Sequence, residues 1–445
     1  MSQKQSWNSK LGFILASAGS AIGLGAMWKF PYVMADNGGA AFLFVFILFT
    51  VLIGLPLLLS EFVMGTASQT HSTRAFGVLT GNKKYNIIGH FGNVGVFLLM
   101  SFYSVIGGFI LIYIMRTIKV MITGATTKDY AQLFGTIISN PTNTILGALC
   151  FIALTAFIVI KGIEGGIEKA SKIMMPLLFI FFMIIIVRSL TLPNAIEGVR
   201  YFLQPDFSKL NQESILFALG QSFFSLSVGF GGMLTYASYI SKKTDLVASS
   251  GTIAGLNILV TLLAGLAIFP ATASLGIANE QGPGLLFIVL PYVFDHLPLG
   301  NLFYLIFLLL FFFATITSSI NLVEINVSNF TKQKNEKRKM AVLLVSIALF
   351  IVSIPSALSF GPMASMKFLK GTFFDNMDFL VSNIMLPIGA LCFAIFSGYV
   401  LDKHVQYEQF VKQPYQEKLF KLWIFLLKYF IPIVIVIVFI NSLIK

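Results

Sequence analysis

Three glycines, Gly19, Gly23 and Gly25, interrupt a stretch that is otherwise apolar enough to cross a membrane, and Lys29 follows in the same stretch. Glycine is a poor helix former, and a charged side chain is costly in lipid. The pattern therefore predicts a helix that is broken rather than continuous. A break frees backbone N–H and C=O groups, which must bond to a ligand or to buried partners.

The two sides of such a break offer different chemistry. The half-helix that begins near Leu24 directs its N–H groups and the positive end of its dipole toward an anion such as a carboxylate. The carbonyl groups just before it can hold a cation that prefers oxygen ligands. One broken helix can therefore bind a carboxylate and an alkali cation side by side. Close packing or a simple kink is the alternative explanation of the glycines.

A second polar interruption lies in the apolar segment SFFSLSVGFGGMLTYASY (222–239). Its small and polar residues are Ser225, Ser227, Gly229, Gly231 and Gly232. Paired interruptions of this kind, at corresponding positions of two halves, indicate a binding site between inverted repeats.

The elements that must position these segments are membrane spans. Of the 445 residues, 57% are hydrophobic and 11% charged, whereas a soluble protein carries about 25% charged residues. We therefore expect an all-α polytopic membrane protein in contact with the lipid bilayer. A span needs about 20 apolar residues. Eleven stretches qualify, at approximately 11–36, 40–66, 87–121, 143–161, 171–190, 213–240, 246–274, 299–330, 340–356, 378–401 and 420–442.

The two interrupted stretches occupy the first position of two five-helix blocks, about 11–190 and 213–401. An odd number of helices inverts the second block relative to the first. We therefore expect a single transmembrane domain (1–445) with a 5+5 inverted repeat, helices 1 and 6 unwound at mid-membrane, and an extra helix at about 420–442.

Lysine and arginine residues predict the orientation. With a cytoplasmic N-terminus, the loops on that side hold 19 of them and the opposite side holds 9. We expect a cell-membrane protein with its N-terminus in the cytoplasm and its C-terminus outside. The basic run KQKNEKRK from Lys332 is then a cytoplasmic loop or, alternatively, a patch for anionic lipids.

The sequence lacks the residue patterns of disulfide frameworks, metal sites and catalytic centres. Cys150 and Cys392 lie in apolar runs, so a disulfide framework is not expected. The four histidines lack the spacing of metal ligands, and no nucleophile–base pair, P-loop or dinucleotide fingerprint occurs. We therefore expect no enzyme and no nucleic-acid partner, and we infer no obligatory protein partner.

Three segments resemble the neurotransmitter:sodium symporter family, in its bacterial branch of leucine and hydrophobic amino-acid transporters. They are WKFPYVMADNGGA (28–40), FFSLSVGFGGMLTYASY (223–239) and ATITSSINL (314–322). The resemblance extends over nearly the whole chain. It implies sodium-coupled import of an amino acid by alternating access.

The resemblance implies a sodium site, which we name the Thr317 site, between carbonyls of the first helix and hydroxyls of the eighth. The matching residues are Gly19, Ile22, Ala314, Thr317 and Ser318. Hydroxyls that bond only to their own helix backbone are the alternative interpretation of Thr317 and Ser318.

The family's other sodium site, named here the Asn257 site, would use Ala21, Ser225, Asn257 and the substrate carboxylate. Ala26 stands where the family has an asparagine ligand. We expect this site to be weak, hydrated or absent, which favours a single firmly bound sodium ion.

For the substrate, the resemblance places a carboxylate in the space left by Gly23, in contact with the N–H groups of Leu24 and Gly25 and the hydroxyl of Tyr103. Carbonyls near Ala21, Phe224 and Ser227 would hold the amino group. The side-chain pocket would be lined by Leu99, Phe224, Phe230, Ser318 and Leu322. This set has no charge, which favours a neutral, hydrophobic or aromatic amino acid.

Charged residues within the spans resemble the gates of the family. Lys29 and Asp378 correspond to the pair that closes the outer pathway, with Tyr103 and Phe230 as a lid beneath it. Snorkelling of Lys29 to the surface is the alternative. Glu61 corresponds to the carboxylate that bonds to the interrupted backbone.

At the cytoplasmic side, Lys4 and Trp7 resemble the family's basic and aromatic pair, and Tyr239 resembles its partner on helix 6. The acidic residue that the family has at the end of helix 8 falls near Lys332. Inner closure is therefore expected to use other contacts, and Glu324 has no assigned role.

Two alternatives to sodium symport stay open. Ala26 and an incomplete anion site, at Phe46 and Thr261, suggest proton-coupled or uncoupled transport and leave chloride unassigned. A transporter-like sensor would bind an amino acid without moving it.

Overall fold

The computed structural model describes residues 5–124, 129–274, 284–331 and 336–444. Apart from one isolated bridge between Phe368 and Gly371, the regular elements of these residues are all helical. This confirms the all-α prediction. In chain order after α1 (Lys10–Ala21) and α2 (Phe30–Asp36), the helices are α3 (Ala40–Phe49), α4 (Leu55–Ser68), α5 (Ser72–Thr80), α6 (Asn86–Thr123), α7 (Tyr130–Ser139), α8 (Pro141–Val159), α9 (Lys169–Leu190), α10 (Ala195–Leu203), α11 (Gln212–Leu226), α12 (Gly232–Ala237), α13 (Leu246–Ala273), α14 (Leu290–Asp295), α15 (Gly300–Thr331), α16 (Arg338–Leu358), α17 (Phe373–Phe379), α18 (Leu386–Ile395), α19 (Lys403–Phe410), α20 (Gln416–Phe425) and α21 (Ile431–Ile444).

Nine helical stretches in the described part of the chain are long and apolar enough to cross a membrane. They are Ala40–Ser68, Lys83–Thr123, Pro141–Val159, Ile163–Leu190, Leu246–Ala273, Gly300–Thr331, Arg338–Leu358, Phe373–Val400 and Gln416–Ile440. Each overlaps one predicted span. The two predicted spans without a continuous counterpart are 11–36 and 213–240, the two that contain the glycine interruptions.

The first of these stretches is helical in two pieces. α1 ends at Ala21, and Ile22 and Gly23 lie outside helical structure. A π-helical turn at Gly25–Lys29 then leads into α2. The interruption therefore falls within the glycine cluster.

The second stretch is divided between α11 and α12. Ser227, Gly229 and Gly231 lie between them with φ angles of 53°, 103° and 79°. Glycine reaches these left-handed conformations without the steric cost that a side chain brings. The sequence of this segment thus explains why α11 cannot continue directly into α12.

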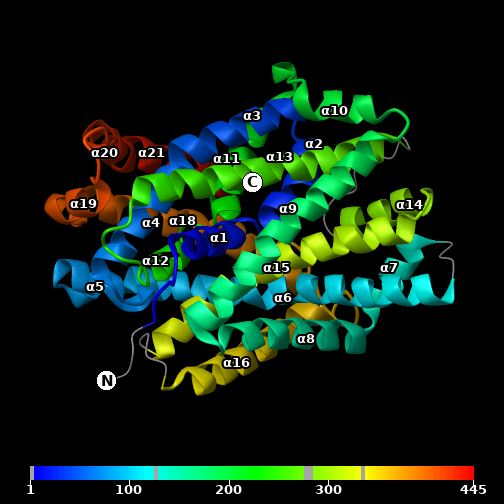
Figure 1. Cartoon of the computed structure of the whole chain (residues 1–445), viewed down its shortest axis with the longest axis horizontal. Coiled ribbons are helices and arrows are strands. Elements are labelled where there is room, and N and C mark those ends of the chain that lie inside the picture. Colours follow the sequence, from blue (N-terminus) through cyan, green and yellow to red (C-terminus); the bar gives the residue numbers. More distant parts are fainter. Residues whose placement is uncertain (1–4, 125–128, 275–283, 332–335, 445) are drawn as a thin grey trace.

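The long helices run side by side, so that both breaks lie in the interior (Figure 1). α15 packs against α6, α8, α9 and α16, and α1 packs against α13 and α15. The N-terminal segment, α5 and α19 lie at one end of the molecule, and α7 and α14 lie at the other (Figure 1).

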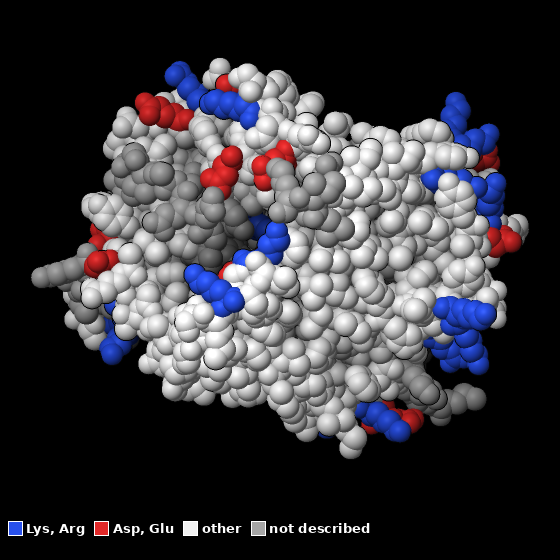
Figure 2. All heavy atoms as spheres, turned by 180° about the vertical axis from the view of Figure 1, so that it is seen from behind, with Lys and Arg blue, Asp and Glu red and all other residues white. Residues whose placement is uncertain are grey.

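Charged side chains gather at these two ends and leave a broad uncharged surface between them (Figure 2). Figure 2 reverses left and right, so its right edge, where Lys and Arg predominate over Asp and Glu, is the end that holds α5 and α19. The opposite end mixes both signs. This distribution agrees with the predicted cytoplasmic N-terminus, which itself stays a prediction.

Candidate functional site

A cavity lies where the two breaks meet α6 and α15. It is lined by Ala21, Gly23, Leu24, Gly25, Val96, Leu99, Tyr103, Phe224, Ser227, Phe230, Gly232, Ser318, Asn321, Leu322, Ile325 and Leu386. All eleven residues expected around a substrate are among them. The sequence reasoning missed Val96, Gly232, Asn321, Ile325 and Leu386. None of these described lining residues carries a charge.

The last carbonyl groups of α1 accept hydrogen bonds from side chains of other helices. Gly19 O accepts from Thr317 Oγ1 at 3.0 Å and from Ser318 Oγ at 3.1 Å. Ser20 O accepts from Ser318 Oγ and from Ser227 Oγ, both at 2.9 Å. The final carbonyls of a helix have no partner within the helix, so α15 and Ser227 of the second break supply the partners here.

The oxygen atoms of the predicted Thr317 site lie close together. Thr317 Oγ1 is 3.1 Å from Ala314 O as well as 3.0 Å from Gly19 O. Ile22 follows directly after the end of α1. The atoms that could ligate a cation here are all oxygens, and they lie at the negative end of the α1 dipole. They therefore fit a hard monovalent cation. Thr317 Oγ1 also bonds to Phe313 O at 2.8 Å, as the packing alternative requires.

The three residues of the predicted Asn257 site also meet. Ser225 Oγ donates to Asn257 Oδ1 at 2.7 Å. The Asn257 amide N–H₂ group donates to Ala21 O at 3.2 Å and to Ser225 O at 2.9 Å. The Ala21 carbonyl thus accepts from the Asn257 amide, as the Gly19 carbonyl accepts from Thr317 and Ser318 at the Thr317 site.

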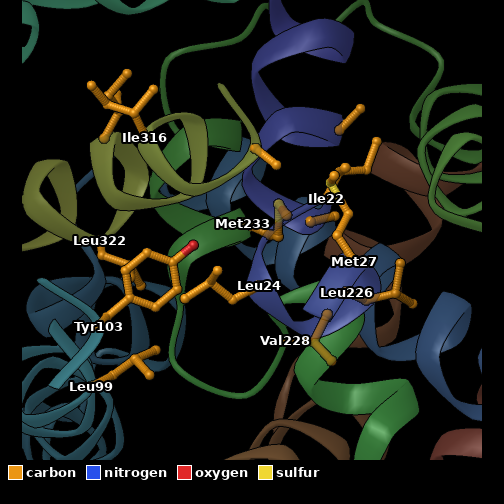
Figure 3. Packing of buried hydrophobic residues seen from close by; sticks show 14 of the residues in the cluster. Ile22, Leu24, Met27, Leu99, Tyr103, Leu226, Val228, Met233, Ile316 and Leu322 are labelled. Carbon is orange, nitrogen blue, oxygen red and sulfur yellow. The ribbon is translucent and has the colours of Figure 1, made fainter. Parts of the chain in front are cut away.

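Gly23 and Gly25 lie where a side chain would collide with the cavity wall. A Cβ atom at Gly23 would lie 3.1 Å from the Tyr103 hydroxyl and closer still to Ser318 Oγ, and one at Gly25 would overlap the Phe224 ring. Figure 3 shows Leu24 of the first break facing the Tyr103 ring. The first break therefore presents bare backbone to the cavity.

Two buried polar side chains bond to the interrupted backbone. Glu61 is fully buried, and its Oε1 and Oε2 atoms accept from the N–H groups of Gly229 at 2.7 Å and Leu234 at 3.0 Å. Gln221 Nε2 donates to Gly25 O. Glu61 therefore stabilises the second break, and Gln221 stabilises the first.

One ion pair lies near one end of the cavity. Lys29 Nζ is 3.4 Å from both Oδ1 and Oδ2 of Asp378, and their side chains are 24% and 34% exposed. A smaller cavity beside this pair is separated from the main one by Leu24, Tyr103 and Phe224, which line both.

The lid beneath the pair differs from the expectation in one residue. Phe224 lies between the two cavities with Tyr103, and Lys29 Nζ is 5.2 Å from the centroid of its ring. Phe230 lines the main cavity only and packs against Gly95, which leaves room for the ring.

Aromatic residues close the N-terminal end. Trp7 Nε1 donates to Tyr236 O at 2.9 Å, and Trp7 N donates to Tyr239 O at 3.3 Å. The Tyr239 hydroxyl donates to Glu324 Oε1 at 2.8 Å. Lys4, the predicted basic partner of Trp7, lies outside the described residues.

Glu324 forms an ion pair with Arg338 in the interior of the molecule. Both guanidinium Nη atoms donate to the Glu324 carboxylate, and the two side chains are 0% and 5% exposed. Arg338 also donates from Nε to Val159 O at 2.8 Å and from Nη1 to Gln5 Oε1 at 3.3 Å. We name Glu324, Arg338 and Tyr239 the Glu324 cluster.

This burial corrects the sequence-based view of Arg338, which counted it in a solvated basic loop. Residues 332–335 of that loop lie outside the described part of the chain. Arg338 instead begins α16 and turns inward. The available signal was Glu324 itself, because a carboxylate in an apolar helix needs a buried cationic partner.

Comparison with protein families supports the resemblance seen in the sequence. The model of the sodium:neurotransmitter symporter family matches residues 4–132 and 135–445. YhdH of Bacillus subtilis, described as an uncharacterized sodium-dependent transporter, is 45% identical over 436 residues, which span 98% of this chain and 97% of that protein. A sodium-dependent transporter of Haemophilus influenzae is 36% identical over 452 residues, with 99% and 98% covered.

A solved structure agrees with the fold. The crystal structure of MhsT in complex with L-phenylalanine is similar to this chain with a TM-score of 0.91 and 37% sequence identity. The similarity covers 99% of this chain and 100% of that one.

Proposed function

This chain belongs to the sodium:neurotransmitter symporter family, and on that premise we propose that it imports a neutral, hydrophobic or aromatic amino acid together with sodium. One observation carries the proposal. The cavity has an uncharged lining that includes backbone of both helix breaks. A cluster of oxygen atoms at the end of α1 lies next to it. The relatives named as sodium-dependent transporters and the phenylalanine bound to MhsT support the same class of activity.

In the proposed complex, the backbone of the breaks binds the part that amino acids share. The N–H groups of Leu24 and Gly25 and the hydroxyl of Tyr103 would bind the carboxylate, in the space that Gly23 leaves. Carbonyls near Ala21, Phe224 and Ser227 would bind the amino group. The apolar wall then takes the side chain, and an uncharged wall disfavours charged substrates because a buried charge needs a partner.

We assign one sodium ion to the Thr317 site. Bound there, the ion supplies a positive charge between the end of α1 and α15. Thr317 and Ser318 would turn their hydroxyl lone pairs toward it instead of donating to the α1 carbonyls. At the Asn257 site, the Asn257 amide donates to the Ala21 carbonyl, and we assign no firmly bound sodium ion there.

We place the Lys29–Asp378 pair on the outer side and the Glu324 cluster on the cytoplasmic side. The cluster of Lys and Arg at the N-terminal end supports this orientation. Alternate opening of the two ends, with the repeats at about 11–190 and 213–401 moving against each other, would expose the cavity to each side in turn.

The test is uptake of individual labelled amino acids into proteoliposomes, with and without an inward sodium gradient. We expect concentrative, sodium-dependent uptake of apolar or aromatic amino acids. Thr317→Val keeps the shape of the side chain but removes its hydroxyl, and it should raise the sodium concentration for half-maximal uptake by about tenfold, equivalent to one lost ligand of about 1.4 kcal/mol.

Three results would contradict the proposal in different ways. Uptake driven by a proton gradient alone would change the coupling ion. Tight binding by correctly inserted protein without any uptake would indicate a sensor. An unaltered sodium dependence in Thr317→Val would remove the sodium site from α15.

A further inference from the structure

Asn321 presents an amide with an unused acceptor at the cavity. The residue lines the cavity and is 1% exposed. Its Nδ2 atom donates to Ser20 Oγ, which fixes one side of the amide. Its Oδ1 atom has no hydrogen-bond partner among the described residues.

A buried acceptor of this kind is unusual in a folded protein. Most buried polar side-chain atoms have a partner, and an exception calls for a physical explanation such as a bound ligand or water. In the interior of a membrane protein the cost of leaving it unpaired is not relieved by bulk solvent. The unpaired atom here borders the cavity that we assign to the substrate, so a ligand group is the natural partner.

The position of Asn321 along α15 indicates which part of a substrate it meets. Ser318, three residues earlier, borders the space beside Gly23 that we assign to the carboxylate. Ile325, four residues later, also lines the cavity, so the lining of α15 from Ser318 to Ile325 extends about 10 Å. Asn321 is therefore about one helical turn away from the carboxylate, at the depth of a long side chain.

The rest of the wall around Asn321 is apolar. Leu322 and Ile325 of α15 are its neighbours in the lining, which also includes Val96, Leu99 and Leu386. Opposite the amide lies Gly232, where a Cβ atom would be only 3.0 Å from Asn321 Nδ2, so the glycine keeps space at this level. A flat apolar group with one polar edge matches such a wall better than a short hydroxyl side chain does.

We propose that Asn321 Oδ1 accepts a hydrogen bond from a donor on an aromatic substrate side chain, an indole N–H or a phenolic O–H. This inference rests on the proposed function and narrows its substrate class. The transporter then prefers tryptophan and tyrosine to aromatic amino acids of the same shape that lack the donor. A buried site built to accept a hydrogen bond discriminates strongly against a ligand that leaves it unpaired.

The first experiment needs no variant of the protein. Unlabelled tryptophan and its benzothiophene analogue, in which sulfur replaces the indole N–H, compete with a labelled substrate for uptake into proteoliposomes. We expect the analogue to need a concentration at least about tenfold higher for half-inhibition, as for the loss of one buried hydrogen bond. Equal inhibition by the two compounds would overturn the proposal.

Asn321→Leu then assigns the discrimination to the amide, because leucine is similar in size and has no polar atom. We expect the variant to lose the preference for tryptophan while still being inhibited by the analogue. Leu322→Met, at the neighbouring position, is the matched control. It should change the half-inhibition concentrations of tryptophan and of its analogue by the same factor. A preference that survives in Asn321→Leu would overturn the assignment.

The outcomes also separate this inference from the proposed function. If no amino acid is taken up in response to sodium, the proposed function fails. If amino acids are taken up but tryptophan and its analogue compete equally, the function stands and only the role of Asn321 fails. A preference for side chains that carry an acceptor in place of the donor would likewise contradict the stated role of Oδ1.

Discussion

The Lys29–Asp378 pair and the Glu324 cluster lie toward opposite ends of the cavity and differ in almost every physical respect. The first joins one ammonium nitrogen to both carboxylate oxygens at 3.4 Å, between side chains that are 24% and 34% exposed. The second is bidentate, with side chains 5% and 0% exposed, and it includes the Tyr239 hydroxyl. An exposed pair contributes about 0–1 kcal/mol, whereas breaking a buried pair by removing one partner costs about 3–5 kcal/mol.

This difference indicates how the two ends can behave. The Lys29 end can separate at lower cost, since both side chains are partly exposed and solvent can reach both charges. Separation at the Glu324 end exposes a carboxylate and a guanidinium whose other partners, among them Val159 O and Gln5, must also be released. We therefore expect the protein without substrate to favour an opening at the Lys29 end.

The largest expected effect comes from removing one charge of the Glu324 cluster. Glu324→Leu leaves Arg338 buried without its anion and should destabilise the protein by about 3–5 kcal/mol, measured by thermal unfolding in detergent. The double variant Glu324→Leu/Arg338→Met should recover most of this loss because no lone charge remains. A loss of less than about 1 kcal/mol of unfolding free energy in Glu324→Leu is what an exposed pair would give. It would show that the two ends do not differ in the strength of their ion pairs.

The next effect is that of the tyrosine in the cluster. Tyr239→Phe removes one donor to a buried carboxylate and should cost about 1.5–3 kcal/mol. Tyr236→Phe is the matched control, because the Tyr236 hydroxyl is buried without a hydrogen-bond partner among the described residues. Unfolding of both variants measures the difference. Equal losses in the two would mean that the hydroxyl bond to Glu324 adds nothing to the cluster.

A smaller effect is expected at the other end. Lys29→Arg supplies a planar fork that can bind both oxygens of Asp378, and the tighter pair should slow opening. We expect a transport rate reduced by up to about fivefold, equivalent to about 1 kcal/mol. Lys29→Met, which cannot pair, should not slow opening. A faster rate in Lys29→Arg than in the wild type would contradict this role of the pair.

The smallest effect comes from salt, which separates the two ends without mutation. A rise in ionic strength from about 0.1 M to 1 M shortens the Debye length from about 10 Å to 3 Å. An impermeant cation other than sodium, added to the outside, should weaken the Lys29–Asp378 pair and leave the buried cluster unchanged. Solvent accessibility of a cysteine introduced near each end measures this. A matching change at both ends would show that the buried cluster is open to ions.

Local signals in the sequence predicted the nine continuous spans of the described residues and the two stretches that are interrupted there. Composition identifies an apolar stretch, and Gly23 or Gly231 identifies a place where a helix cannot continue. The resemblance to the family then placed all eleven expected substrate residues around one cavity. The spans and the breaks depend on residues close together in the chain, whereas the cavity was predicted from the family resemblance.

The contacts that were missed depend on how helices pack. Arg338 reads as one more cation in a basic run until α16 turns it toward Glu324. Asn321 was not singled out because α15 is buried on nearly all sides around it, so no polar face of the helix distinguishes a cavity residue from a packing residue. Phe224 and Phe230 are equivalent in type and close in sequence, and only the geometry of the second break decides which ring separates the two cavities.

The occupancy of the Asn257 site bears on how far such a protein can concentrate its substrate. Under the proposed one-sodium assignment, each neutral amino acid is driven by the electrochemical difference of a single cation. A membrane potential of 100 mV provides about 2.3 kcal/mol per charge, which corresponds to an accumulation of roughly fiftyfold. A second coupled cation would square that ratio and would also double the sodium that the cell must pump out again. With the single sodium ion that we propose, each substrate molecule is accumulated less steeply, and less sodium has to be pumped out again.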